Sequence, residues 1–203
     1  ADPATDKEAE GARSRGPALW GKNVYGNNVD GRAIAVDRNT GEFVWDVQVA
    51  RTILGYDNLP GGPDAEHFVI GEKFTAAPLA VEGKILVGQS AGDWGTRGWL
   101  AALDADTGEE LWRTYTIPAP GEPGHETWAD DHNAWRTGGA SLWTTGSYDP
   151  ATRLTIWGTA NPVPMFDPEY RPGDNLWTDA ALGFNIDTGA IEWGFQYIAN
   201  ESW

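Results

Sequence analysis

Two loop segments of this sequence place an oxygen-bearing side chain among small residues, directly after a strand-like stretch. In Gln89–Gly98, Asp93 is the single carboxylate, and the small residues before it let backbone approach a ligand closely. In Trp157–Pro164, Asn161 precedes a proline that restricts its backbone. Carboxylate and amide oxygens are the ligands that hard cations such as calcium prefer. Two side chains are too few for a calcium site, so a bound ligand with carboxylates of its own would have to complete the shell.

A third segment, Thr137–Trp143, is a flexible run that ends in a tryptophan. Trp143 lies outside the phase of the repeated tryptophans of this chain, which makes it a candidate platform for a planar ring. Each candidate also has a plainer interpretation. Asp93 could be an ordinary turn residue, Asn161 could open an Asx turn, and Trp143 could pack in the core.

The elements that must position these loops are indicated by a phrase that occurs three times, in 35–45, 102–112 and, more loosely, 183–193. Each copy has an aspartate or asparagine at the end of a strand, a Thr-Gly turn, and a tryptophan four residues after the glycine. This pattern is typical of a β-hairpin. A supersecondary unit that recurs along the chain predicts a β-propeller.

Each position of the phrase has a physical role. The aspartate or asparagine bonds to the backbone two residues on and opens the turn, and the glycine can take the positive φ that closes it. A tryptophan in the same phase of every copy predicts that each blade docks on its neighbour through this side chain. The tryptophans are Trp45, Trp112 and Trp193, and the glycines are Gly41, Gly108 and Gly189.

The fold class that follows is all-β, a partial β-propeller. One blade takes roughly 40–50 residues, so the 203 residues of the chain hold about three to four blades. The spacing between copies of the repeat exceeds the length of one blade. The extra length lies in the turn-rich stretches 55–72, 118–137 and 162–175, and loops of that length are often functional. We expect residues 1–203 to form one partial propeller domain, truncated at both ends, because closed propellers need more blades.

Composition excludes several classes of partner and site. The formal net charge is −16, with 14 lysines and arginines against 30 aspartates and glutamates. Nucleic acid is therefore not an expected partner, since phosphate binding needs a basic face. The chain has no cysteine, which excludes disulfides and thiolate metal sites in this segment. No stretch reaches the roughly 18 apolar residues of a membrane-spanning helix.

Four segments resemble the quinoprotein alcohol dehydrogenases, which use pyrroloquinoline quinone (PQQ) and include methanol and ethanol dehydrogenases. The segments are Ser90–Gly98, Trp143–Pro150, Trp157–Pro162 and Arg171–Thr178. The resemblance runs from about Arg15 to Trp203 and is more specific than the hairpin phrase, which non-enzymatic propellers share. It implies an eight-bladed propeller with PQQ near its axis, of which this chain would be an internal piece.

The resemblance also implies roles for individual residues. Asp93 matches the carboxylate ligand of the metal, and Asn161 matches its amide ligand. Trp143 matches the tryptophan on whose face PQQ stacks. The other residues that match the cofactor pocket are Arg15, which contacts the quinone, Thr75, which bonds a PQQ carboxylate, and Ser90, Ala91, Gly92 and Ser141, which line it.

Three departures from the family pattern matter. Asp93 stands where the family usually has glutamate, so the cation must sit closer to the backbone or bind one oxygen fewer. Many members carry adjacent cysteines just upstream of the arginine that matches Arg15, whereas residues 7–10 here read Lys-Glu-Ala-Glu. The family's catalytic aspartate matches a position beyond Trp203, so no catalytic residue is assigned and the chain alone is expected to be inactive.

The implied activity is oxidation of a small alcohol to an aldehyde, with calcium or a lanthanide as the metal and a c-type cytochrome as electron acceptor. The family also implies a periplasmic location. Two alternatives remain open: a non-enzymatic scaffold propeller of the outer-membrane assembly type, and an inactive homologue that keeps the fold. The substrate stays undefined. Residues of the 118–137 insertion could shape an entrance or simply pack the loop: His125, Trp128, His132 and Trp135.

Overall fold

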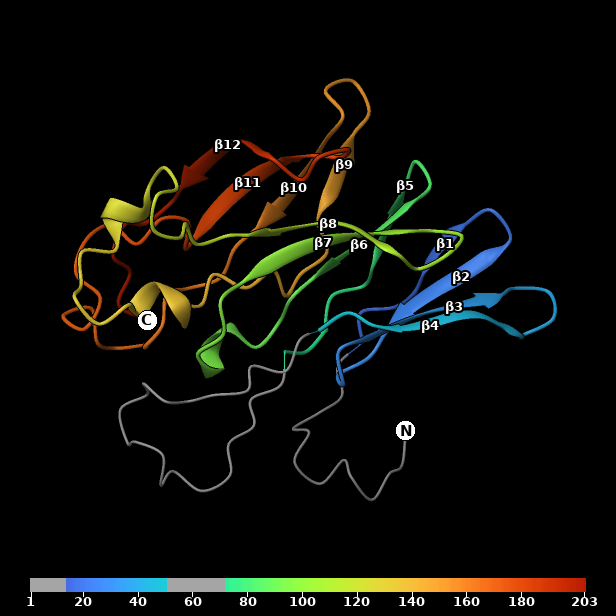
Figure 1. Ribbon diagram of the computed structural model, residues 1–203, viewed down its shortest axis with the longest axis horizontal. Coiled ribbons are helices and arrows are strands. Elements are labelled where there is room, and N and C mark those ends of the chain that lie inside the picture. Colours follow the sequence, from blue (N-terminus) through green and yellow to red (C-terminus); the bar gives the residue numbers. More distant parts are fainter. Residues whose placement is uncertain (1–13, 51–71) are drawn as a thin grey trace, which may run out of the picture.

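The computed structural model describes residues 14–50 and 72–203. These residues form three antiparallel four-stranded sheets (Figure 1). Blade 1 contains β1 (Ala18–Trp20), β2 (Asn23–Asn27), β3 (Arg32–Asp37) and β4 (Phe43–Gln48); blade 2 contains β5 (Leu79–Val81), β6 (Lys84–Gly88), β7 (Trp99–Asp104) and β8 (Glu110–Tyr115); blade 3 contains β9 (Ser147–Asp149), β10 (Leu154–Gly158), β11 (Ala180–Asn185) and β12 (Ile191–Gln196). The prediction of an all-β partial propeller is confirmed, with three blades in the described residues.

In the described residues, the loops between the strands carry three single-turn 3₁₀ helices: η3 (Gly92–Trp94), η4 (His125–Thr127) and η5 (Ala134–Arg136). Strand order within each blade follows the chain, so the Thr-Gly hairpins lie at one end of the sheets. The longer connections that follow β6, β8 and β10 lie at the opposite end (Figure 1). All three loop segments with candidate chemistry are therefore at the same end of the fold.

The three hairpins share one register. Ala35 faces Trp45, Ala102 faces Trp112, and Gly183 faces Trp193, and in each blade a bulge follows immediately. A bulge inserts one residue and increases the local twist. Since it falls at the same place in each blade, the tryptophan leaves each sheet in the same direction.

The first Thr-Gly turn shows why this register is stable. Asp37 Oδ1 accepts hydrogen bonds from the backbone N–H of Asn39 at 2.8 Å and of Thr40 at 3.2 Å. The N–H of Gly41, at φ +76°, donates to the Asp37 carbonyl at 2.8 Å. The N–H bonds from Asn39 and Thr40 hold the pKa of Asp37 below its ordinary value. The turns that begin at Asp104 and Asn185 repeat this pattern.

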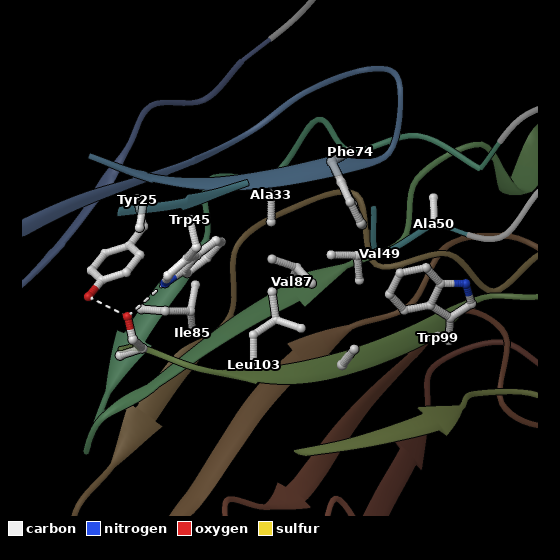
Figure 2. Close-up of a cluster of buried hydrophobic side chains, with 13 residues drawn as sticks. Tyr25, Ala33, Trp45, Val49, Ala50, Phe74, Ile85, Val87, Trp99 and Leu103 are labelled. Atoms are coloured by element: carbon white, nitrogen blue, oxygen red, sulfur yellow. Dashed lines mark hydrogen bonds between the residues drawn. The ribbon is translucent and has the colours of Figure 1, made fainter. Parts of the chain in front are cut away.

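Blade 1 docks on blade 2 through the repeated tryptophan. Trp45 Nε1 and the Tyr25 hydroxyl both donate to the carbonyl oxygen of Ala105, each at 3.0 Å (Figure 2). The indole ring covers Gly108, where an added Cβ would lie 2.9 Å from it. Around this contact the two blades bury a shared hydrophobic core. Besides Tyr25, Trp45 and Ala105, the core contains Ala33, Ala35, Val49, Ala50, Phe74, Ile85, Val87, Trp99, Ala101 and Leu103.

Blade 2 docks on blade 3 in the same way. Trp112 Nε1 donates to the carbonyl oxygen of Ile186 at 3.1 Å, and its ring lies over Gly189. A second core forms between these blades from Leu86, Leu100, Ala102, Leu142, Trp157, Ala180, Leu182 and Phe184. The prediction that the repeated tryptophan joins neighbouring blades is confirmed at both contacts.

The energetic contribution of the Trp112–Gly189 contact can be measured separately from the backbone strain of the Thr-Gly turn. Gly189 and Gly41 have nearly equal φ, +74° and +76°, but a Cβ at Gly189 would meet the Trp112 ring at 2.5 Å, whereas Gly41 has nothing within 4 Å. We expect Gly189→Ala to lower the free energy of unfolding by about 1–3 kcal/mol more than Gly41→Ala, because overpacking adds to the common backbone cost. Urea unfolding of both variants measures the difference, and equal losses would contradict it.

Candidate functional site

Backbone pairing brings the three candidate loops together at Gly139. Arg97, in the loop after β6, pairs with Gly139 in a parallel bridge, and Gly139 pairs with Pro162 in an antiparallel one. The N–H of Ala140 donates to the carbonyl oxygen of Asn161 at 3.1 Å. The segments that contain Asp93, Trp143 and Asn161 are therefore neighbours in one layer.

Glycines make this close approach possible. A Cβ on Gly92 would lie 2.7 Å from Ser141 Oγ, and a Cβ on Gly139 would lie 2.6 Å from the Asn161 carbonyl oxygen. Gly139 also has φ +84°, a conformation that favours glycine. The small residues before Asp93 thus serve loop-to-loop packing, in addition to any approach to a ligand.

Two hydroxyl groups form the centre of the site. Thr75 Oγ1 and Ser90 Oγ are 2.9 Å apart, and the N–H of Thr75 donates to Ser90 Oγ at 3.1 Å. Thr75 Oγ1 also reaches the carbonyl oxygen of Trp143 at 3.3 Å. Ser90 is held in place by a backbone bridge to Lys73. The pair connects the start of blade 2 to the loop that leads into blade 3.

The ring of Trp143 lies at the surface with a cation over it. Trp143 is 46% exposed, so the described residues do not enclose its ring in a core. The guanidinium carbon of Arg15 lies 4.9 Å from the ring centroid, and Arg15 Nη1 donates to the Thr75 carbonyl at 3.1 Å. An aromatic face, a cation and two hydroxyl groups suit a flat ligand that carries carboxylates.

The two predicted metal ligands belong to segments that pair with the backbone on opposite sides of Gly139. Asp93 is exposed in the 3₁₀ turn η3, after Ala91 at φ 93°. Asn161 is half-buried, and its Nδ2 donates to the Pro162 carbonyl at 3.2 Å. This bond uses the amide nitrogen, whereas a cation needs the amide oxygen.

Within residues 14–50 and 72–203, no three histidine, cysteine, aspartate or glutamate side chains gather where they could hold a metal ion. A cation beside Asp93 would therefore depend on neutral oxygens, such as that of Asn161, and on carboxylates of a bound ligand. The donor set suits a hard cation, because each available donor is an oxygen.

Sequence reasoning did not identify Arg171, which lies in a matched segment but carries no signal of burial. Its side chain is fully buried, with 0% exposure. Arg171 Nε donates to the Pro164 carbonyl at 3.1 Å, Nη1 to Asn175 Oδ1 at 2.8 Å, and Nη2 to the Glu201 carbonyl at 2.5 Å. Nη1 also reaches Asn200 Oδ1 at 3.2 Å. Arg171 thus ties the residues after β12 to the loop that carries Asn161.

Asp179 is a second residue that sequence reasoning missed. Its N–H donates to the Ala160 carbonyl at 3.0 Å, next to Asn161, and its Oδ2 is buried without a hydrogen-bond partner. Burial raises the pKa of Asp179 to about 6; the nearby Glu201 adds to this rise and Arg171 opposes it. At neutral pH the carboxyl of Asp179 is therefore mostly ionised in the folded chain, and its ionisation lowers the free energy of unfolding.

Removal of the Asp179 charge is expected to stabilise the chain in a pH-dependent manner. The folded pKa lies above the ordinary value of 3.8, so the folded state binds more protons and this group's contribution to stability improves as pH falls through about 6 towards 4. We expect Asp179→Asn to raise stability by about 1–2 kcal/mol near pH 8 and by little near pH 4. Thermal unfolding at both pH values measures this, with Glu169→Gln at an exposed position as control. A pH-independent gain would contradict the assignment.

The 118–137 insertion is a packed loop. Trp128 is buried with Ile117, Ala134 and Ala140, and its Nε1 donates to the Leu176 carbonyl. This favours loop packing for Trp128. His125, Trp135 and His132 are more exposed: the His125 and Trp135 rings meet edge to face at 5.7 Å, and His132 lies 4.1 Å from the ring of Tyr170.

Other sequence expectations lie outside the described residues. These are the cysteine-free stretch 7–10 upstream of Arg15 and nearly all of the turn-rich stretch 55–72. Among the helices that the structure does describe, none has the length and apolar character to cross a membrane.

Comparison with known proteins adds independent findings. Residues 5–203 match the family described as glucose/ethanol/alcohol dehydrogenase, β-propeller domain, which bears the label PQQ. The chain is 34% identical to the quinoprotein alcohol dehydrogenase PedH of Pseudomonas putida, over 94% of this chain and 31% of PedH. It is 32% identical to methanol dehydrogenase [cytochrome c] subunit 1 of Methylorubrum extorquens, with the same two coverages.

A solved structure described as a europium-containing methanol dehydrogenase superposes with a TM-score of 0.78 at 31% identity, over 94% of this chain and 33% of that chain. The chain thus spans about a third of the length of the proteins it matches. The match extends across all three blades and the loops between them, well beyond the repeated hairpins.

Proposed function

This chain belongs to the β-propeller family of the PQQ-dependent glucose, ethanol and alcohol dehydrogenases, and we propose that it carries the cofactor-binding part of an enzyme that oxidises alcohols to aldehydes. The observation that carries this proposal is the contact network at the exposed face of Trp143. Arg15 lies over the ring, Thr75 bonds to the backbone carbonyl of Trp143, and Ser90 bonds to Thr75, so three separate segments meet beside this residue.

Each residue of the network has a role that its chemistry suits. Trp143 offers an open aromatic face on which a planar quinone can stack. Arg15 offers a charged donor for a quinone oxygen or carboxylate, and the hydroxyl groups of Thr75 and Ser90 can donate to a carboxylate. The proposed lining is completed by Ala91, Gly92 and Ser141, of which Gly92 and Ser141 lie at the close contact of two loops.

Asp93 and Asn161 are the proposed protein ligands of the metal. We propose calcium, with a lanthanide as the alternative that a europium-containing relative supports. When bound, PQQ supplies the two-electron acceptor and the cation supplies Lewis acidity, which the protein does not provide itself. The residues of this chain would bind and orient that pair. The base that takes the alcohol proton is proposed to match a position beyond Trp203.

The wider assignment is also a proposal. Residues 1–203 would form a single partial propeller domain of a longer protein, which agrees with the share of each relative that is covered. A small alcohol is the proposed substrate, a c-type cytochrome the acceptor and the periplasm the location. The name of the Methylorubrum extorquens relative supports the cytochrome. The chain alone is expected to show no turnover.

Metal-dependent cofactor binding tests the proposal. Equilibrium dialysis of the purified chain with PQQ should show retention that increases with calcium. We expect Asp93→Ala to weaken binding in calcium about tenfold, the effect of about 1.4 kcal/mol, and to change little in a chelator. Asp131→Ala, which removes a fully exposed carboxylate, should behave as the parent.

Three outcomes would each contradict one part of this proposal. Absence of PQQ retention with and without calcium would refute the cofactor site. If PQQ is retained in a calcium-dependent manner and Asp93→Ala leaves that retention unchanged, Asp93 is not a metal ligand, but the cofactor site stands. Steady alcohol-dependent dye reduction by the 203-residue chain would contradict the proposed absence of its base.

A further inference from the structure

Two buried polar residues close the turn that carries Asp93, residues 91–95, which we call the Asp93 turn. Gln89 and Thr96 are both 0% exposed, and Gln89 Nε2 donates to Thr96 Oγ1 at 2.5 Å. Thr96 Oγ1 in turn donates to the carbonyl oxygen of Ala91 at 2.8 Å. Ala91 has φ 93°, a conformation that persists in a non-glycine residue only where neighbouring contacts hold it. The Asp93 turn is therefore held in one conformation by the groups around it.

Arg97 fixes the end of the Asp93 turn through both its backbone and its side chain. Its backbone pairs with Gly139 in the parallel bridge. Its side chain is 14% exposed. Arg97 Nε donates to the carbonyl oxygen of Ile117 at 2.8 Å, and Nη2 donates to the same oxygen. The guanidinium thus ties the turn to the residue just before the 118–137 insertion.

Two aromatic rings lie against the guanidinium of Arg97. Its central carbon is 4.3 Å from the ring centroid of Tyr115 and 4.9 Å from that of Trp135, within the range of a cation–π contact. Tyr115 ends β8, whereas Trp135 belongs to η5 of the 118–137 insertion. Glu122 Oε2, in the same insertion, lies 3.5 Å from Arg97 Nη2. The insertion therefore supplies an aromatic face and a carboxylate to this cation.

We propose that Arg97 is a positioning residue for Asp93, and that the 118–137 insertion holds the metal-ligand turn in place through it. The inference rests on the proposed function, because it takes Asp93 as the metal ligand. An aspartate has a short side chain, so the position of its backbone decides whether its carboxylate meets the cation. Groups that orient a metal ligand change metal affinity by about 10- to 100-fold when they are removed.

The ratio of the PQQ affinity in calcium to the PQQ affinity in a chelator measures this role. We expect Arg97→Met to lower the ratio about three- to tenfold, because the Asp93 carboxylate is held less well, and to change the affinity in the chelator by less than about twofold. Trp135→Ala, at a half-buried position, should lower the ratio by a smaller factor. Equilibrium dialysis gives both affinities, and circular dichroism confirms that each variant is folded.

A double-mutant cycle separates positioning from general damage. If Arg97 acts through Asp93, Arg97→Met should change the ratio little in a chain that already carries Asp93→Ala. Arg113→Met is the matched control. The Arg113 guanidinium is 5% exposed and lies 3.8 Å from the Trp99 ring, but it donates to the Val49 carbonyl at the contact of blades 1 and 2. Its removal should lower the free energy of unfolding and leave the ratio as in the parent chain.

The outcomes distinguish this inference from the proposed function. Absence of calcium-dependent PQQ retention in the parent chain would overturn both. Retention that is lost in Asp93→Ala but kept in Arg97→Met and Trp135→Ala would overturn the positioning role alone. The role would also be overturned if Arg97→Met weakened PQQ binding equally in calcium and in the chelator, or if it still lowered the ratio after Asp93 was replaced. Either result would mean general loss of structure rather than loss of the ligand's position.

Discussion

Replacement of Trp143 by alanine is expected to weaken PQQ binding by about 10- to 100-fold. Stacking of a planar heteroaromatic ring on an aromatic side chain is worth about 1–3 kcal/mol, and each 1.4 kcal/mol is tenfold in affinity. The ring is 46% exposed, so its removal opens no large cavity. The contact to Thr75 uses the backbone carbonyl of Trp143 and survives the change.

Equilibrium dialysis with PQQ, at saturating calcium, measures this loss. Trp20→Ala is the matched control, because Trp20 is 41% exposed and belongs to blade 1. Trp143→Phe should retain part of the affinity, since it keeps a smaller aromatic face. Equal PQQ binding by the Trp143→Ala variant and the parent would remove this ring from the cofactor site.

Substitution of Arg171 by methionine is expected to lower the free energy of unfolding by about 3–5 kcal/mol. The change leaves Asn175 Oδ1 and the carbonyls of Pro164 and Glu201 without their donor. Each buried polar group that loses its partner costs about 1–3 kcal/mol. Arg171→Lys should recover little, because one ammonium cannot reproduce the fixed fork of a guanidinium.

Urea unfolding measures the loss, and hydrogen exchange shows where it acts. The amides of Phe166 and Asn200, which donate to the carbonyls of Ser202 and Asp174, should lose protection, whereas the β2–β3 ladder should keep it. Arg136→Met removes an exposed arginine and serves as control. A loss below about 1 kcal/mol, within the range of ordinary substitutions, would show that the Arg171 contacts are not important for stability.

The two predictions concern different parts of one layer. Trp143 lies on the loop before β9, and Arg171 lies on the loop before β11, yet both loops are held through the segment 139–164. The affinity for PQQ should depend on the exposed ring of Trp143, and the stability of the chain after β12 should depend on the buried guanidinium of Arg171.

The hairpins could be predicted from sequence because their determinants are local. An aspartate or asparagine, a threonine and a glycine within five residues specify the turn, and the tryptophan four residues later specifies which side of the blade is apolar. The hydrogen bonds of Asp37, Asp104 and Asn185 show the same turn three times. The family resemblance in turn indicated Arg15, Thr75, Ser90 and Trp143, which the structure brings into contact; their role in binding PQQ stays a prediction.

Tryptophans at equivalent positions of the repeat nevertheless differ in their burial. Trp45 is almost completely buried, whereas Trp193 is 40% exposed in the described chain. Nothing within either copy of the phrase distinguishes them, because burial depends on whether a neighbouring blade covers the ring. The exposure of Trp143, 46% in the described chain, likewise depends on contacts that the residues beside it do not reveal.

By itself the sequence determined the repeated hairpin, the all-β class and the family, since each of these is written in short segments of fixed residue order. Only the tertiary structure decided which tryptophans are covered, that Arg171 is wholly buried, and that Asp179 holds an unpartnered oxygen. Those properties arise from contacts between residues such as Arg171 and Glu201, which lie far apart in the chain. Burial and the pKa of a carboxyl depend on everything packed around a group, and no local pattern encodes that.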